Sequence, residues 1–177
     1  YDAVGNITSV EDQLGRVTAY EYDLNRNIVK MTAPNGAVTQ YAYNAYDLAS
    51  KVTDGLENVT NYAYDGNENI TKITDVFGNE QSYEYNANGL VTKYINQLGN
   101  EQTITYDGNG NPTAVKDARG NTSTFEYDSA NRTAKAVSAE GLTVDYTYNS
   151  LGMIASETDN TGGSNTYTYD NAGRLIK

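Results

Sequence analysis

Apolar and polar residues alternate over short stretches of this chain, and the stretches return every 21 residues. Residues 17–22 read Val-Thr-Ala-Tyr-Glu-Tyr, and the later repeats follow the same plan. Because residues i and i+2 of a β-strand point to one face, this pattern predicts a strand that places two tyrosine rings on the same side. Val, Ile, Thr and Tyr also favour strands, so we expect one strand over residues 7–11 and another over residues 17–22 of the first repeat.

Tyrosine marks the interval, and no insertion or deletion interrupts it. Tyr fills all nine positions that are 21 residues apart: Tyr1, Tyr22, Tyr43, Tyr64, Tyr85, Tyr106, Tyr127, Tyr148 and Tyr169. Two residues before each, from the second onward, stands another large residue: Tyr20, Tyr41, Tyr62, Tyr83, Ile104, Phe125, Tyr146 and Tyr167. A motif with one constant period is the signature of a repeat protein. We therefore expect residues 1–177 to be one array, cut from a longer protein, with full repeats starting at residues 1, 22, 43, 64, 85, 106, 127 and 148 and a partial repeat at 169–177.

Each repeat contains two turn signals, such as Asp2-Ala3-Val4-Gly5 and Asp12-Gln13-Leu14-Gly15. Asp first and Gly fourth favour a type I turn, and Gly also supplies the positive φ of the bulge that closes such a hairpin. The fourth position of the second turn is Glu57 in one repeat and glycine in the others: Gly15, Gly36, Gly78, Gly99, Gly120, Gly141 and Gly162.

The first turn of each repeat varies more. Its fourth position is Arg26, Asp47, Glu68 or Asn131 in four repeats. Asp and Asn tolerate a positive φ, whereas Arg and Glu do not adopt it readily, so we expect another form of turn at Arg26 and Glu68. Pro112 replaces an Ile-like strand residue and removes a ladder donor, which predicts a local fault there.

Tight turns at both ends of every strand predict an antiparallel meander in a curved, spiralling single-layer sheet. Helices are excluded by turn signals every 10 or 11 residues, and a parallel β-helix is disfavoured by the same turns. Lys30 and its equivalents in other repeats face strands with Glu21, Glu84 and Glu126, so we expect exposed cross-strand ion pairs that contribute little each. The outermost strands offer bare edges that favour self-association of the segment.

Composition excludes several functions. The net charge is −11, from 12 Lys+Arg and 23 Asp+Glu, and such a surface repels nucleic acids and anionic membranes. Cys and His are absent, which removes thiol nucleophiles, His bases and the usual zinc ligands. No apolar run is long enough to span a membrane. We expect no catalysis, metal or cofactor, because capping of turns explains the recurrent Asp residues without calcium.

The unit at Tyr1 to Glu21, Y-D-A-V-G-N-I-T-S-V-E-D-Q-L-G-R-V-T-A-Y-E, resembles the YD repeat of Rhs proteins. Similar repeats occur in WapA-type wall proteins, Tc toxin B and C subunits and teneurins. The resemblance covers all 177 residues. It implies a β-sheet ribbon that spirals into a hollow shell around a C-terminal toxin. Partners would then be the rest of the shell and that enclosed toxin.

Two functions stay open from the sequence. The first is a structural wall segment in a bacterial secreted or cell-surface toxin, in which the recurrent tyrosines and glycines are structural positions. The alternative is a carbohydrate-binding adhesive module, because rows of exposed Tyr would stack on sugar rings. Burial of the tyrosines discriminates between them, since a residue that recurs in every repeat is more often used for packing than for ligand contact.

Overall fold

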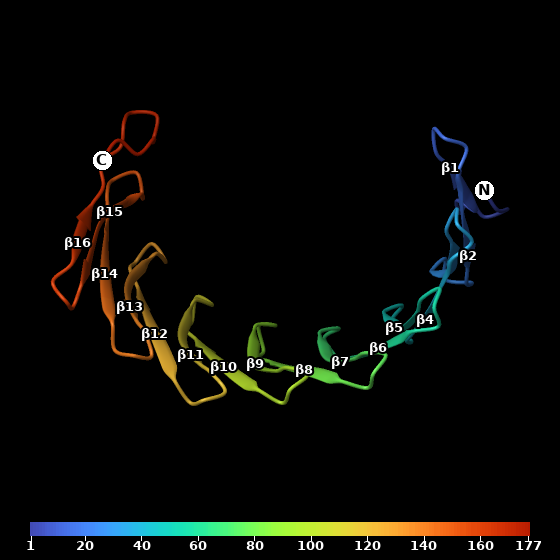
Figure 1. The fold of residues 1–177 in the computed structure, drawn as a ribbon, viewed down its shortest axis with the longest axis horizontal. Coiled ribbons are helices and arrows are strands. Elements are labelled where there is room, and N and C mark those ends of the chain that lie inside the picture. Colours follow the sequence, from blue (N-terminus) through green and yellow to red (C-terminus); the bar gives the residue numbers. More distant parts are fainter. The chain divides into compact units, whose positions relative to one another are not determined.

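The computed structural model describes residues 1–177 and is all-β (Figure 1). Sixteen strands follow one another: β1 Ser9–Glu11, β2 Val17–Tyr22, β3 Ile28–Thr32, β4 Val38–Tyr43, β5 Ala49–Thr53, β6 Val59–Tyr64, β7 Ile70–Thr74, β8 Glu80–Tyr85, β9 Val91–Ile95, β10 Glu101–Tyr106, β11 Pro112–Lys116, β12 Thr122–Tyr127, β13 Thr133–Val137, β14 Thr143–Tyr148, β15 Ile154–Asp159 and β16 Ser164–Thr166. Long apolar helices of the kind that cross membranes are absent from the structure.

The strands form one sheet in sequence order, β1 to β16, with antiparallel neighbours and no crossover. This confirms the predicted antiparallel meander. The chain divides into two compact units, Tyr1–Gly89 with Ile95–Gly99, and Leu90–Tyr94 with Asn100–Lys177. Each unit is built from the same hairpins. The first strand of the chain is shorter than expected, because it begins at Ser9 rather than at residue 7.

Six strands, β2, β4, β6, β10, β12 and β14, pair with the next strand through the same irregularity. In β2 and β3, Glu21 lies opposite Lys30, but Tyr22 lies opposite Ile28, so one residue of β3 is skipped. The same shift recurs between β4 and β5, β6 and β7, β10 and β11, β12 and β13, and β14 and β15. A β-bulge re-aims the side chains beside it. The bulge therefore sets the direction of the second tyrosine in each pair.

No residue of this single-layer sheet is fully buried. Burial instead alternates along the long strands: in β2, Thr18, Tyr20 and Tyr22 are half-buried, whereas Val17, Ala19 and Glu21 are exposed. The same alternation marks the tyrosine pairs of β4, β6 and β14. One face of the sheet thus carries the tyrosine rings, and the opposite face carries mostly short polar and charged side chains.

The prediction of a different turn at Arg26 and Glu68 is wrong. Both residues adopt a positive φ, 70° and 68°, and Glu57 does so as well at 65°. The backbone N–H groups of Arg26 and Glu68 donate to the backbone carbonyl oxygens of Asp23 and Asp65, as the N–H groups of the glycines do in other repeats. The left-handed region costs a non-glycine residue about 1–2 kcal/mol. That cost is offset by the hydrogen bonds that the turn carboxylate makes to its own loop.

The local fault predicted at Pro112 is also wrong. Pro112 lies opposite Tyr106 with the same register shift as the other repeats, and β11 continues to Lys116 without interruption. The reason is its place in the strand. Proline is tolerated at the first residue of a strand and beside a bulge, where the ladder is already interrupted.

Candidate functional site

The second tyrosine of each pair binds the backbone of the preceding repeat. In β4, the Tyr43 hydroxyl donates a hydrogen bond to the carbonyl oxygen of Ile28, 15 residues earlier, at 2.8 Å. The same bond, between 2.7 and 2.9 Å, recurs in all eight repeats that have a predecessor: Tyr22 to Ile7, Tyr43 to Ile28, Tyr64 to Ala49, Tyr85 to Ile70, Tyr106 to Val91, Tyr127 to Pro112, Tyr148 to Thr133 and Tyr169 to Ile154. These hydroxyls are therefore occupied within the sheet.

Partial burial of the rings helps to keep these hydroxyls protonated. Desolvation raises the pKa of Tyr43, Tyr64 and Tyr85, and neighbouring tyrosines add to the shift. A higher pKa keeps the hydroxyl neutral, so it remains a donor. Each hydroxyl connects the end of its own strand to the start of the adjacent preceding strand, as Tyr43 of β4 does to Ile28 of β3.

The first tyrosine of the pair lies opposite an apolar residue of the next strand in several repeats, although Tyr146 lies opposite Glu157. Tyr20 lies opposite Met31, and Tyr62 lies opposite Ile73. In unit two, Ile104 and Phe125 fill this position opposite Val115 and Ala136. Aromatic and aliphatic cross-strand pairs stabilise a sheet without needing a hydroxyl. This explains why the first position accepts Ile and Phe.

The Asp after the second tyrosine organises the turn. Asp65 Oδ1 accepts hydrogen bonds from the backbone N–H of Asn67 and Asn69, both at 2.9 Å, and the Asn69 side chain donates to the same carboxylate. The second turn uses Asp54 in the same way, with Leu56 and Asn58 as donors. Side-chain and backbone donors from Asn69 and Asn58 hold the pKa of both carboxyls below the ordinary value of 3.8. The recurrent Asp residues are thus turn caps.

Consecutive first turns contact each other in two places. Asp47 Oδ1 accepts hydrogen bonds from the side-chain amides of Asn25 and Asn27, at 2.9 and 2.7 Å. Asn131 Oδ1 accepts the equivalent bonds from Asn109 and Asn111, at 2.9 and 3.1 Å. Both acceptors stand at the left-handed fourth position of the turn, with φ 59°. The left-handed conformation therefore directs their oxygen toward the preceding repeat.

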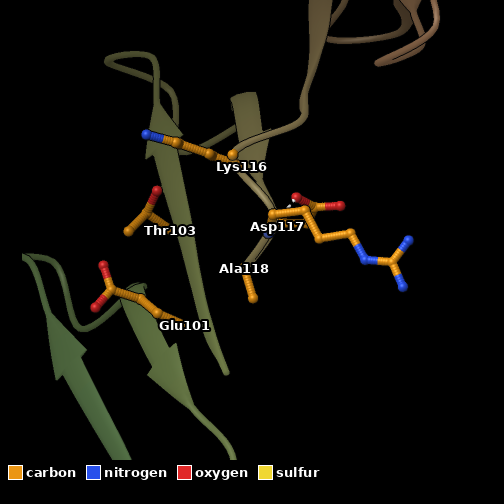
Figure 2. Close-up of a pocket in the computed structure, with 7 residues that line it drawn as sticks. Glu101, Thr103, Lys116, Asp117 and Ala118 are labelled. Carbon is orange, nitrogen blue, oxygen red and sulfur yellow. Dashed lines mark hydrogen bonds between the residues drawn. The ribbon is translucent and has the colours of Figure 1, made fainter. Parts of the chain in front are cut away.

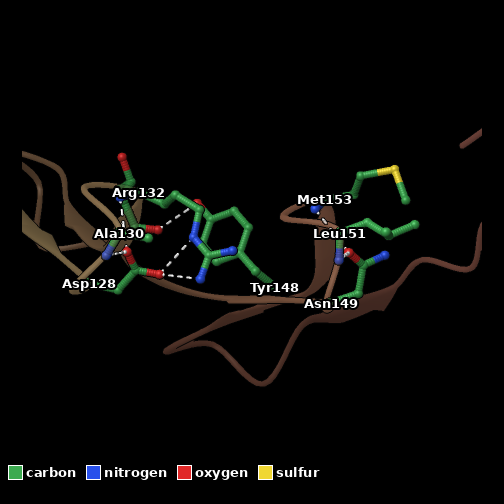
Figure 3. A network of polar contacts seen from close by, with 8 residues as sticks. Asp128, Ala130, Arg132, Tyr148, Asn149, Leu151 and Met153 are labelled. Carbon is green, nitrogen blue, oxygen red and sulfur yellow. Dashed lines mark hydrogen bonds and ion pairs between the residues drawn. The ribbon is translucent and has the colours of Figure 1, made fainter.

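Arg132 joins a turn to a tyrosine of the following repeat (Figure 3). Its guanidinium donates to Asp128 Oδ2 from Nε at 2.8 Å, and Nη2 lies 2.6 Å from the same oxygen. The guanidinium carbon lies 4.2 Å from the centroid of the Tyr148 ring, a distance typical of a cation–π contact. The Tyr148 hydroxyl in turn donates to the Thr133 carbonyl at 2.7 Å. One side chain thus stabilises both the turn and the tyrosine bond.

The polar face carries ion pairs and open grooves. Lys30 pairs with Glu21 at 2.7 Å, as predicted, while Lys72 pairs with Glu80 at 3.0 Å, on the following strand rather than the preceding one. A groove of about 420 Å³ lies over β10 and β11, lined by Glu101, Thr103 and Lys116 on the strands and Asp117 at the turn (Figure 2). A similar groove of about 460 Å³ lies over β4 to β6. No group of three His, Cys, Asp or Glu side chains is arranged to hold a metal.

The sequence pattern of the RHS Repeat family matches residues 1–38, 106–143 and 148–177, which is more than half of the chain. The chain belongs to the RHS Repeat family. No curated protein matches the chain in sequence. The family assignment agrees with the 21-residue repeat and with the tyrosine–aspartate turns described above.

Solved structures similar to this RHS Repeat chain share its fold at low sequence identity. A crystal structure of TcdB2-TccC3-Cdc42 aligns with a TM-score of 0.57 and 15% identity over 99% of this chain and 13% of that chain. A crystal structure of TcdB2-TccC3 aligns with a TM-score of 0.56 and 15% identity, over 99% of this chain and 14% of that chain. The structure of a Photorhabdus luminescens Tc holotoxin pore aligns with a TM-score of 0.54 and 14% identity, over 99% of this chain and 13% of that chain. The chain therefore spans about a seventh of the length of these relatives or less.

Proposed function

We propose that this RHS Repeat chain is a stretch of wall in a β-sheet shell that encloses a C-terminal toxin. The observation that carries the proposal is the recurrent bond from the second tyrosine of a repeat to the backbone of the preceding one. This bond uses the most regular side chain of the sequence for cohesion of the sheet. It engages the hydroxyl of the second tyrosine in every repeat that has a predecessor, so these hydroxyls are not free for a ligand or a reaction.

The whole of residues 1–177 would then serve as one repeat array within a longer protein. The structural positions of this array are the paired tyrosines and the second-turn glycines, whose φ lies between 74° and 95°. Partners would be further repeats of the same shell and the enclosed toxin, in a bacterial protein that is secreted or held at the cell surface. The chain would contribute enclosure rather than catalysis.

The fold similarity to TcdB2-TccC3 supports this proposal, because a ribbon with consecutive strands and no core of its own needs to be closed by more of the same sheet. Curvature and spiral closure are part of the proposal. Bare edges at β1 and β16 would then be paired within the longer protein, and a segment expressed alone would associate through them.

The test is protease protection in the longer protein that carries these repeats. We expect its C-terminal region to resist digestion until the repeats are unfolded by urea. Replacing Tyr43, Tyr64 and Tyr85 together by Phe should lower the urea concentration at which this region becomes accessible. Digestion of the C-terminal region in the native wild-type protein, with the repeats still intact, would contradict enclosure.

Carbohydrate binding is the second candidate, and the polar grooves favour it. The groove over β10 and β11 contains the carboxylate of Glu101, the hydroxyl of Thr103 and the ammonium of Lys116, which are donors and acceptors suited to a sugar. It contains no aromatic ring for stacking. A glycan array probed with the wild-type chain and with Thr103→Val tests this candidate. Binding that Thr103→Val abolishes would support an adhesive role.

A further inference from the structure

Large apolar side chains protrude from one rim of the first unit. Leu56, Phe77 and Leu98 occupy the third position of three consecutive second turns, and they are 83%, 86% and 85% exposed. We refer to these three residues as the apolar rim. Folding of the turn does not require them, because the same position is Asn35, Arg119, Glu140 or Thr161 in other repeats. Exposed apolar residues gathered in one place mark interaction surfaces.

The three turns are adjacent in the sheet. Turn 54–57 and turn 75–78 are joined by the paired strands β6 and β7, and the Gln97 side-chain amide donates to Asp75 Oδ2 at 3.2 Å. Two strand spacings of about 4.8 Å separate neighbouring turns on the same rim. The apolar side chains therefore recur at about 10 Å along a line.

Charge at the apolar rim has one sign. Turns 54–57, 75–78 and 96–99 contain Asp54, Glu57 and Asp75 and no Lys or Arg. Among the lysines of the adjoining strands, Lys72 on β7 is paired with Glu80, and Lys51 on β5 lines a groove together with Asp54 and Glu57. The pKa of the Asp54 and Asp75 carboxyls lies below its ordinary value because turn donors bind them, so both stay charged at neutral pH. The apolar rim thus places exposed apolar side chains beside negatively charged carboxylates.

We propose that the apolar rim docks a cationic amphipathic α-helix. Seven residues of helix rise about 10.5 Å, so a helix with Leu at every seventh position matches the spacing of Leu56, Phe77 and Leu98. Lys or Arg beside this stripe would meet Asp54, Glu57 and Asp75. A second copy of this chain fits less well, because it would bring like charges together, and a chain of net charge −11 repels its own copies.

The binding experiment uses the whole chain and a fluorescent, amidated helical peptide of about three heptads, with Leu at every seventh position and Lys at the flanking positions. Anisotropy titration should show binding that weakens about tenfold in Leu56→Asn/Phe77→Asn/Leu98→Asn, and that weakens with added salt as an attraction between opposite charges does. Leu24→Asn and Leu151→Asn, which remove exposed leucines from first turns, are the controls and should leave binding unchanged.

Three results would overturn the proposal. In the first, the triple variant binds the peptide as well as the wild type does. In the second, a scrambled peptide of equal composition binds as well as the designed peptide, which indicates unspecific charge attraction. Alternatively, sedimentation of the chain alone would show a dimer that the triple variant abolishes and that salt strengthens, which assigns the rim to a second copy. If the triple variant fails to fold, Phe77→Arg replaces it, because Arg119 occupies the same position of another second turn.

Discussion

The hydroxyl of Tyr43 donates to the carbonyl oxygen of Ile28 at 2.8 Å, and the backbone of Ile28 itself lies opposite Tyr22. Each repeat is thereby connected to its predecessor twice, through the strand ladder and through a tyrosine hydroxyl. In a sheet without any buried residue, such bonds replace part of the cohesion that a core supplies elsewhere. Tyrosine is suited to this role because its ring also covers the neighbouring strand.

Removal of one hydroxyl should therefore destabilise the sheet measurably. Tyr64→Phe deletes the bond to the Ala49 carbonyl and leaves the ring in place, so we expect the free energy of unfolding to fall by about 1 kcal/mol. Urea denaturation followed by circular dichroism measures the change. Tyr62→Phe is the matched control. Tyr62 lies on the same strand as Tyr64, opposite Ile73 of β7, but makes no bond to a preceding repeat. Equal losses from the two variants would contradict a special role for the Tyr64 hydroxyl.

The sequence predicted the strands and turns because their signals are local. Alternation of side chains defines Val17–Tyr22, and Asp12 with Gly15 defines the turn that precedes it. The bond from Tyr43 to Ile28 could not be predicted in the same way. It depends on the bulge that places Tyr43 opposite Ala49, and a bulge has no fixed sequence marker.

A signal for the hydroxyl bond is nevertheless present in the sequence. The first aromatic position of the pair accepts Ile104 and Phe125, which have no hydroxyl, whereas the second position is Tyr in every repeat. That contrast indicates a hydroxyl with a partner. The predictions at Arg26 and Pro112 failed because single-residue preferences were weighed without the turn carboxylate and the bulge that accommodate them.

The non-glycine residues with positive φ should be sites of stabilisation. Glu57→Gly relieves backbone strain at φ 65°, so we expect the free energy of unfolding to rise by about 0.5–1 kcal/mol after the entropy cost of glycine. Gly36→Ala is the reciprocal variant at φ 84°, and it should destabilise by about 1 kcal/mol although no atom lies within 4 Å of the added Cβ. A stabilising Gly36→Ala would show that φ does not control these turns.

Acid should loosen the turns together. In the folded chain, hydrogen bonds from Asn58, Asn69 and neighbouring backbone N–H groups hold the pKa of Asp54 and Asp65 below 3.8, the value expected in the unfolded chain. A depressed folded pKa contributes stability above the unfolded pKa and loses it as pH falls through the folded value. The free energy of unfolding should therefore be level from pH 7 to about 5 and fall below about pH 4.

Chemical denaturation at a series of pH values measures this profile. Asp65→Asn is the matched variant, because Asn44 occupies the same turn position and its side-chain oxygen accepts the same two backbone bonds, from Tyr46 and Leu48. The variant should lose less stability than the wild type between pH 4 and pH 2, since one titrating carboxylate is gone. An identical acid profile would indicate that carboxylates elsewhere in the chain control the transition.

Arg132 offers a test of coupling between a turn and the tyrosine of the next repeat. Arg132→Asn should retain a turn bond to Asp128, as Asn27 does to Asp23, but should lose the contact with the Tyr148 ring. We expect a loss of about 0.5–1 kcal/mol, the usual contribution of an exposed cation–π pair. A double-mutant cycle with Tyr148→Leu isolates this term, because the effect of Arg132→Asn should shrink once the ring is absent. If the two losses simply add, the guanidinium acts on the turn alone and Tyr148 is held only by its bond to Thr133.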